Sequence, residues 1–182
     1  LGRFVLLPQD DLSLAALMKS PLFNLGEDAL FELAARRGEG ESLWQRLQHE
    51  ADDGILFHQT ARTLKSYMAL ANQLAPHDFY ARVLGVHGGR AAFLARLGTE
   101  VSDILDEFLT FALDQERSGL PGLQAFVSTL EMEAPTVKRE QDKERDEVRI
   151  MTVHAAKGLE APVVFLADGG GAAFSNQHVP SL

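Results

Sequence analysis

Apolar residues recur every three or four positions over most of this chain, which is the spacing of amphipathic helices. One stripe joins Leu14, Leu17 and Met18, and another joins Leu64, Tyr67 and Met68. The pattern predicts a mainly α protein whose helices lie within the ranges 10–21, 26–40, 41–54, 57–75, 77–85, 90–98, 102–119 and 121–134.

Residues at the ends of these segments predict where the helices begin and end. Asp10 or Asp11 is placed to cap the first helix, and Ser102 is placed to cap the helix within residues 102–119. Gly38 follows the apolar stripe of its segment, so we expect it to form the C-terminal cap there. The predicted helices together form one helical body.

The pattern changes towards the end of the chain. Residues 138–149 mix basic and acidic side chains with almost nothing apolar, which is typical of a solvated helix end or hinge. Apolar and polar positions then alternate from Val148, and residues 162–167 form a continuous apolar run, as in a buried parallel strand. We therefore expect a helical domain over residues 1–146, and a strand–turn–strand remnant of an α/β domain over residues 147–182. Because two strands cannot hold together alone in water, we expect the rest of the sheet to belong to a larger protein.

Composition limits the function classes that remain open. The chain has no cysteine, which excludes disulfides, thiolate metal sites and cysteine nucleophiles. No apolar run approaches the roughly 20 residues that span a bilayer, and the start of the chain lacks a signal-peptide cleavage region, so we expect a cytoplasmic protein without membrane contact. The net charge of −9 has the wrong sign for gripping nucleic acid by bulk attraction. Any contact with DNA must therefore depend on a few well-placed residues.

One polar cluster lies between the two predicted strands. It consists of Thr152, His154, Lys157, Gly158 and Glu160. Glycine after lysine permits a tight turn whose backbone N–H groups can face a phosphate, and a nearby glutamate can accept a hydrogen bond from a sugar hydroxyl. Ligands of open α/β sheets bind at the carboxyl ends of strands. The cluster predicts a site for a nucleotide or a phosphate backbone, although similar turns also occur as purely structural loops.

A family resemblance makes this prediction more specific. Residues 148–166, "VRIMTVHAAKGLEAPVVFL", resemble motif V of the UvrD/Rep-like helicases, with the form T-x-H-x-x-K-G-L-E followed by a strand. The upstream segments "DDLSLAALMKSPLF" and "LDEFLTFALDQE" are similar to the AddA-type, RecB-like helicase and nuclease subunits of bacterial double-strand-break repair. The resemblance implies that the helical body is an accessory subdomain inserted in the second RecA-like motor domain. The tail is then the return into that motor domain.

The resemblance also implies roles for the residues of the cluster. Gly158 matches a turn close to the terminal phosphate, Glu160 matches a glutamate that hydrogen-bonds the ribose, and Lys157 lies between them, so these three are expected to bind nucleotide. Thr152 and His154 match positions that couple the nucleotide state to the DNA strand.

For the longer protein, the resemblance implies an ATP-dependent 3′–5′ DNA helicase or translocase with an associated exonuclease, acting in double-strand-break repair and recombination. It would use ATP and Mg²⁺, bind single-stranded and double-stranded DNA, and pair with a second, AddB-like subunit. This chain contains no G-x-x-x-x-G-K-[ST] phosphate loop, and no catalytic or metal-binding residue is expected in it. We expect it to be inactive and to bind no cofactor by itself. Two alternatives remain: a regulatory helical module that contacts a partner subunit or duplex DNA, and a helical scaffold with a chance motif.

Overall fold

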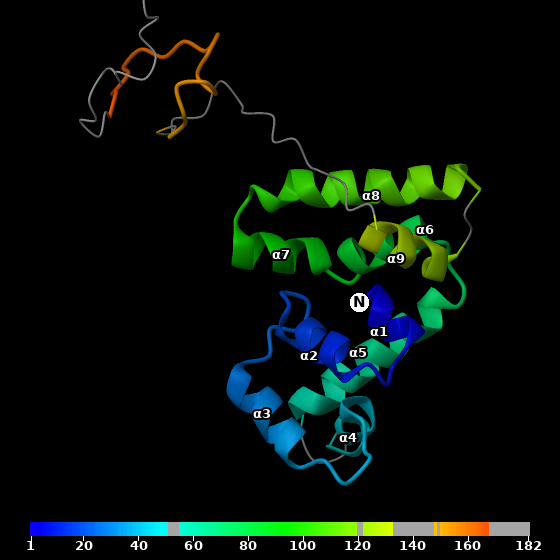
Figure 1. Cartoon of the computed structure of the whole chain (residues 1–182). Helices are drawn as coiled ribbons and strands as arrows, with labels where there is room; N and C mark the ends of the chain where they lie inside the picture. The colour runs from blue at the N-terminus through cyan, green and yellow to red at the C-terminus, as the bar shows by residue number, and fades with distance from the viewer. Residues whose placement is uncertain (51–54, 120–121, 133–147, 149, 168–182) are drawn as a thin grey trace, which may run out of the picture. The chain divides into compact units, whose positions relative to one another are not determined.

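The computed structural model describes residues 1–50, 55–119, 122–132, 148 and 150–167. The chain divides into two compact units, Leu1–Arg139 and Glu140–Leu182, and each is described by itself. The helices of the described residues, labelled in Figure 1, are α1 (Gly2–Leu6), α2 (Asp11–Lys19), α3 (Glu27–Ala35), α4 (Leu43–Glu50), α5 (Ile55–Ala71), α6 (Pro76–Leu84), α7 (Gly89–Leu97), α8 (Val101–Arg117) and α9 (Leu123–Met132). The prediction of a mainly α fold is confirmed.

The long helix α5 links two hydrophobic cores of the first unit. Its Leu64 is buried in one core and its Tyr67 in the other. Figure 1 shows α3 and α4 beside one end of α5, and α6, α8 and α9 towards its other end. The first core draws on α1 to α5 and contains Phe4, Leu14, Leu17, Met18, Leu25, Leu33, Leu43, Trp44, Leu47, Ala61 and Leu64. The second contains Tyr67, Phe79, Tyr80, Val83, Ala112, Leu123 and Phe126.

Aromatic rings dominate the second core. The ring centroid of Tyr80 lies 4.9 Å from that of Phe79, 4.8 Å from that of Phe108 and 5.6 Å from that of Phe126. Phe126 in turn lies 5.8 Å from both Phe108 and Phe111. These are tilted and edge-to-face arrangements, which aromatic quadrupoles prefer. The cluster therefore holds α6, α8 and α9 together by shape as well as by burial.

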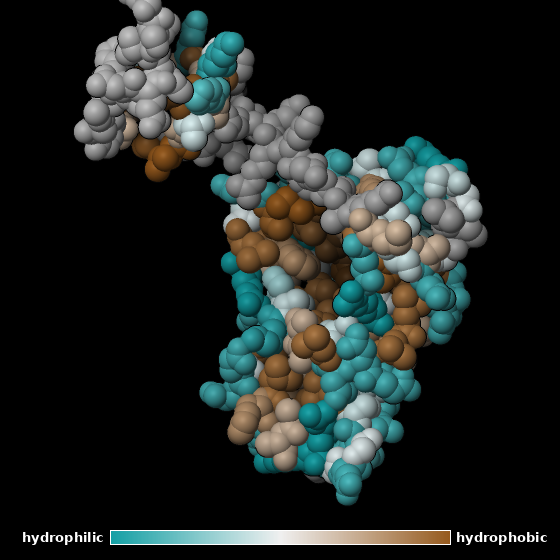
Figure 2. Space-filling view, in the orientation of Figure 1, coloured by the Kyte–Doolittle hydropathy of each residue, from teal (hydrophilic) through white to brown (hydrophobic). Residues whose placement is uncertain are grey.

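A smaller apolar cluster joins α6, α7 and α8. Leu84, Val101 and Leu105 are buried in it, and Phe93 and Leu94 of α7 cover it only partly. Figure 2 shows hydrophobic side chains gathered over α7 and α8 on the face that it draws. The packing of α7 on α8 thus leaves apolar surface open on this unit.

Helix ends follow local capping in one case and tertiary packing in another. Asp10 caps α2 as predicted: its carboxylate accepts the Ser13 N–H at 3.0 Å and the Ser13 hydroxyl at 2.6 Å, and these hydrogen bonds lower the pKa of Asp10. The prediction that Ser102 caps α8 is wrong, because the helix already begins at Val101. Val101 is buried against its neighbours, and the hydroxyl of Ser102 instead accepts a hydrogen bond from Arg90 at 3.0 Å.

The C-terminal cap predicted at Gly38 is also wrong. Helix α3 ends at Ala35, and Arg36 takes the capping position. Arg37 leaves the helix to form an ion pair with Asp11 at the start of α2. The helix thus ends before Gly38 is reached, and Arg37 contacts a neighbouring helix instead of continuing α3.

The second unit is described from its turn and the residues around it. Residues 153–158 form a turn, and no strand occurs among residues 148 and 150–167. The two predicted strands are therefore not confirmed, since a strand is defined by hydrogen bonds to a neighbouring strand and no described segment supplies them. The side chains of residues 163–166 are 69–91% exposed. The predicted hinge lies outside the described residues except for Val148, and the division at residues 146 and 147 stays a prediction.

Candidate functional site

The polar cluster folds as a single capped turn. The Thr152 carbonyl accepts the Ala156 N–H at 3.0 Å, which is the hydrogen bond of one helical turn. The Thr152 hydroxyl accepts the Ala155 N–H at 3.3 Å, as a capping residue does. The Lys157 N–H completes the turn by donating to the His154 carbonyl at 3.4 Å. This capping role of Thr152 is not among the roles expected from the sequence, although threonine is a common capping residue at the start of a helical turn.

Gly158 closes the turn in a left-handed conformation. Its φ is +84°, a region that L side chains rarely adopt, and glycine enters it without steric cost. The next residue, Leu159, then donates its N–H to the Ala156 carbonyl at 3.0 Å. The lysine-glycine pair thus reverses the chain and directs Glu160 away from the helical turn.

The structure brings most of the predicted site residues together. Thr152 starts the turn, His154, Lys157 and Gly158 lie within it, and Glu160 follows two residues later. All five residues are exposed to solvent. Within the described part of the chain, the side chains of His154, Lys157 and Glu160 form no hydrogen bond or ion pair. They are therefore available to a ligand rather than engaged in holding the turn.

This arrangement suits binding better than bond-breaking chemistry. A flexible ammonium group at Lys157 and a carboxylate at Glu160 flank a glycine whose backbone is accessible. The Lys157 ammonium and the backbone N–H groups can bind a phosphate, and the Glu160 carboxylate can accept a hydrogen bond from a sugar hydroxyl. Among the described residues, no three histidine, aspartate or glutamate side chains gather closely enough to hold a metal ion. The residue types of the turn are therefore those that can contact a phosphate and a sugar hydroxyl.

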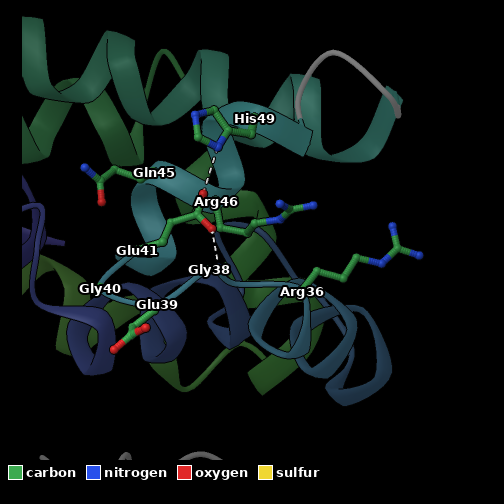
Figure 3. Close-up of a pocket in the computed structure, with 8 residues that line it drawn as sticks. All are labelled: Arg36, Gly38, Glu39, Gly40, Glu41, Gln45, Arg46 and His49. Carbon is green, nitrogen blue, oxygen red and sulfur yellow. Dashed lines mark hydrogen bonds and ion pairs between the residues drawn. The ribbon is translucent and has the colours of Figure 1, made fainter.

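A second polar group lies in the first unit, around the loop between α3 and α4. Figure 3 shows Glu41 between the Gly38 backbone and the His49 ring; its carboxylate accepts the Gly38 N–H at 2.8 Å and lies 2.7 Å from Nδ1 of His49. The Gly38 hydrogen bond, with a smaller contribution from His49, holds the pKa of Glu41 below its usual range. These contacts of Glu41 hold the loop against α4, so this polar group is best explained as a structural one.

The same region contains a buried carboxylate. Glu50, at the end of α4, is 5% exposed and pairs with Arg46 one turn earlier. Arg36 approaches its other oxygen at 3.6 Å. The hydrogen bond from Arg46, together with the charges of both arginines, lowers the pKa of Glu50. The charge of Glu50 is thus compensated by two arginines of the helical unit, which is a structural role.

Comparison with known proteins adds to this geometry. Residues 54–177, more than half of the chain, match the family described as UvrD-like helicase C-terminal domain. The matched range contains the whole turn of residues 152–160. The family resemblance drawn from the sequence is therefore confirmed.

Individual proteins similar to this chain are named as helicase/nuclease subunits. The chain is 28% identical over 180 residues to an ATP-dependent helicase/nuclease subunit of Streptococcus pneumoniae, covering 87% of this chain and 15% of that protein. It is 29% identical over 171 residues to the protein of the same name from Leuconostoc mesenteroides, covering 88% and 13%. The chain thus spans about one seventh of the length of these relatives. None of the described helices is long and apolar enough to cross a lipid bilayer.

Proposed function

We propose that this chain, which belongs to the UvrD-like helicase C-terminal domain family, supplies part of the motor of an ATP-dependent DNA helicase and nuclease. The observation that carries the proposal is the exposed turn of residues 152–160, which lies inside the range matched by the family. The relatives carry "helicase/nuclease" in their names and are several times longer than this chain. The activity is therefore proposed for the longer protein that contains it.

The nucleotide-binding part of the proposal rests on the end of the turn. Gly158, held at positive φ, leaves its backbone open to the terminal phosphate of ATP. Lys157 supplies a positive charge beside it, and Glu160 accepts a hydrogen bond from the ribose. ATP supplies the phosphoryl group whose transfer to water drives movement; these three residues bind and orient it. The phosphate loop and the Mg²⁺ ligands come from other parts of the longer protein.

The DNA-coupling part rests on the start of the turn. Thr152 caps the helical turn through its hydroxyl, and His154 projects from the same turn without a partner among the described residues. Because one short hydrogen-bonded turn separates these residues from Gly158, a shift at the phosphate end moves His154 as well. We assign to Thr152 and His154 the coupling between nucleotide state and the DNA strand.

The rest of the assignment concerns the whole protein. We propose that residues 1–146 form the accessory subdomain and residues 147–182 belong to the motor domain. The longer protein is proposed to translocate 3′ to 5′ in the cytoplasm, to use Mg²⁺ with ATP, and to act on single-stranded and double-stranded DNA in double-strand-break repair and recombination. It is further proposed to have exonuclease activity and an AddB-like second subunit.

The test is ATP hydrolysis by the full-length protein, with and without single-stranded DNA. Glu160→Ala is expected to raise the KM for ATP, and His154→Ala to weaken the stimulation by DNA while leaving the basal rate. Glu39→Ala, an exposed glutamate of the α3–α4 loop, is the matched control and is expected to change neither. Unchanged kinetics in both turn variants would make the turn structural and refute the proposal.

A further inference from the structure

Backbone hydrogen bonds join the two ends of the exposed turn. The Thr152 carbonyl accepts the Ala156 N–H at 3.0 Å, and the Ala156 carbonyl accepts the Leu159 N–H, also at 3.0 Å. Ala156 therefore connects the start of the turn to its end through both of its backbone groups. Leu159 lies between Gly158 and Glu160 in the sequence, so this chain of hydrogen bonds runs from Thr152 to the residues proposed to bind nucleotide.

The side chain of Thr152 adds a third hydrogen bond at the start of the turn. Its hydroxyl accepts the Ala155 N–H at 3.3 Å, in the first turn, where a helix has no backbone acceptor of its own. Of residues 152–160 only Ala156 is half-buried and the others are exposed, so burial contributes little to the shape of the turn. A single helical turn is costly to form, because several dihedral angles are fixed for one hydrogen bond. The folded turn therefore depends on its few hydrogen bonds, including the one made by the Thr152 hydroxyl.

Gly158 depends on these hydrogen bonds because its own conformation is permissive. Glycine adopts positive and negative φ about equally well, so the residue itself does not select the observed φ of +84°. The hydrogen bond from Leu159 to Ala156 spans Gly158 and favours that φ. A loosened turn would leave Gly158 and Glu160 in several conformations, and the affinity for a ligand falls with the fraction of molecules in the binding-competent one.

We propose that Thr152 is a positioning residue for the nucleotide. Its hydroxyl holds the first turn, and through Ala156 this turn sets the φ of Gly158 and the direction of Glu160. The inference rests on the proposed function and makes it more specific. Thr152 takes part in coupling by ordering the nucleotide end of the turn, and contact with the DNA strand is left to His154.

The test compares Thr152→Val, which keeps the shape of the side chain and removes the hydroxyl, with Thr152→Ser, which keeps the hydroxyl. In ATP hydrolysis by the full-length protein, Thr152→Val is expected to raise the KM for ATP about fivefold, the factor that one capping hydrogen bond supplies. Saturating ATP recovers the ordered turn, so kcat should stay at the wild-type value. Thr152→Ser should restore the KM, and the affinity for single-stranded DNA without nucleotide should be the same in all three proteins.

Thr110→Val is the matched control. Thr110 is an exposed threonine of α8 whose hydroxyl donates to the Asp106 carbonyl at 2.9 Å, so the change removes a similar hydrogen bond far along the chain from the turn. It is expected to leave the KM for ATP unchanged. An equal rise in KM for Thr110→Val and Thr152→Val would contradict a specific role of Thr152.

The remaining outcomes separate this inference from the proposed function. An unchanged KM in Thr152→Val, or a raised KM that Thr152→Ser does not restore, would overturn the inference. Weaker binding of single-stranded DNA by Thr152→Val with a normal KM would also overturn it, because the hydroxyl would then serve the DNA directly. If Glu160→Ala raises the KM while Thr152→Val does not, the proposed function stands and only the positioning role fails. Normal kinetics in Glu160→Ala and His154→Ala would instead refute the proposed function itself.

Discussion

Replacing Phe126 by alanine should remove the centre of the aromatic core. Phe126 is 1% exposed, and its ring meets those of Tyr80, Phe108 and Phe111. A phenylalanine-to-alanine change at such a site loses the transfer free energy of the ring and leaves a cavity, at a total cost of about 3–5 kcal/mol. Small domains unfold with roughly 5–15 kcal/mol, so the variant should be severely destabilised.

Phe31 provides the matched control within the same unit. It also lies in a helix, but its side chain is 75% exposed. Phe31→Ala removes little buried area and gains helix propensity, so the free energy of unfolding should change by no more than about 0.5 kcal/mol. The assay is urea denaturation followed by circular dichroism at a helical wavelength. If Phe126→Ala and Phe31→Ala unfolded within about 1 kcal/mol of each other, the aromatic core would not stabilise the helical unit as described.

Three further predictions concern backbone packing and titration. Gly89→Ala should lower the melting temperature strongly, because its Cβ would lie 2.7 Å from the Val83 carbonyl oxygen; Gly26→Ala, with nothing within 4 Å, is the control and should have a much smaller effect. Arg46 holds the pKa of Glu50 below its ordinary value of 4.5, so the stabilisation is complete above that pH and is lost as the pH falls through the folded-state pKa. Urea denaturation from pH 7 to pH 3 should show a flatter pH dependence for Glu50→Gln, and an identical dependence would contradict the pairing. Burial raises the pKa of both tyrosines, Tyr67 and Tyr80, above 10.0, so the stability that their neutral forms contribute is complete below that pH and is lost as the pH rises through the folded-state pKa. In a pH titration, tyrosinate absorbance of the folded chain should therefore appear at higher pH than that of the urea-unfolded chain. Coincident titrations would contradict the burial of these side chains.

Most of the helices could be predicted because each of them depends on its own local stripe of apolar residues. Leu14, Leu17 and Met18 repeat at helical spacing, and all three are buried. The errors occur where distant contacts decide. Gly38 is not a cap because α3 already ends at Ala35, and Arg37 pairs with Asp11 of α2, a distant contact that no local pattern contains.

The C-terminal segment, residues 147–182, shows what a local pattern cannot predict. Its alternation and apolar run predicted strands, but strand pairing is non-local and cannot be read from the strand itself. The turn between the two predicted strands was easier to predict, because a glycine after lysine allows the positive φ that a tight turn requires, and Gly158 has such a φ.

The most direct test of the motor assignment is whether Glu160 recognises ribose. Equilibrium binding of ATP, 2′-deoxy-ATP and 3′-deoxy-ATP should be measured for the full-length protein and for Glu160→Ala. The wild type is expected to prefer ATP over at least one deoxy form by about tenfold or more, as a hydrogen bond to a charged group implies, and the variant should lose that preference. Glu160→Gln, which keeps an acceptor oxygen, should retain part of it. Equal preference for ATP in wild type and Glu160→Ala would contradict the nucleotide-binding role of the turn.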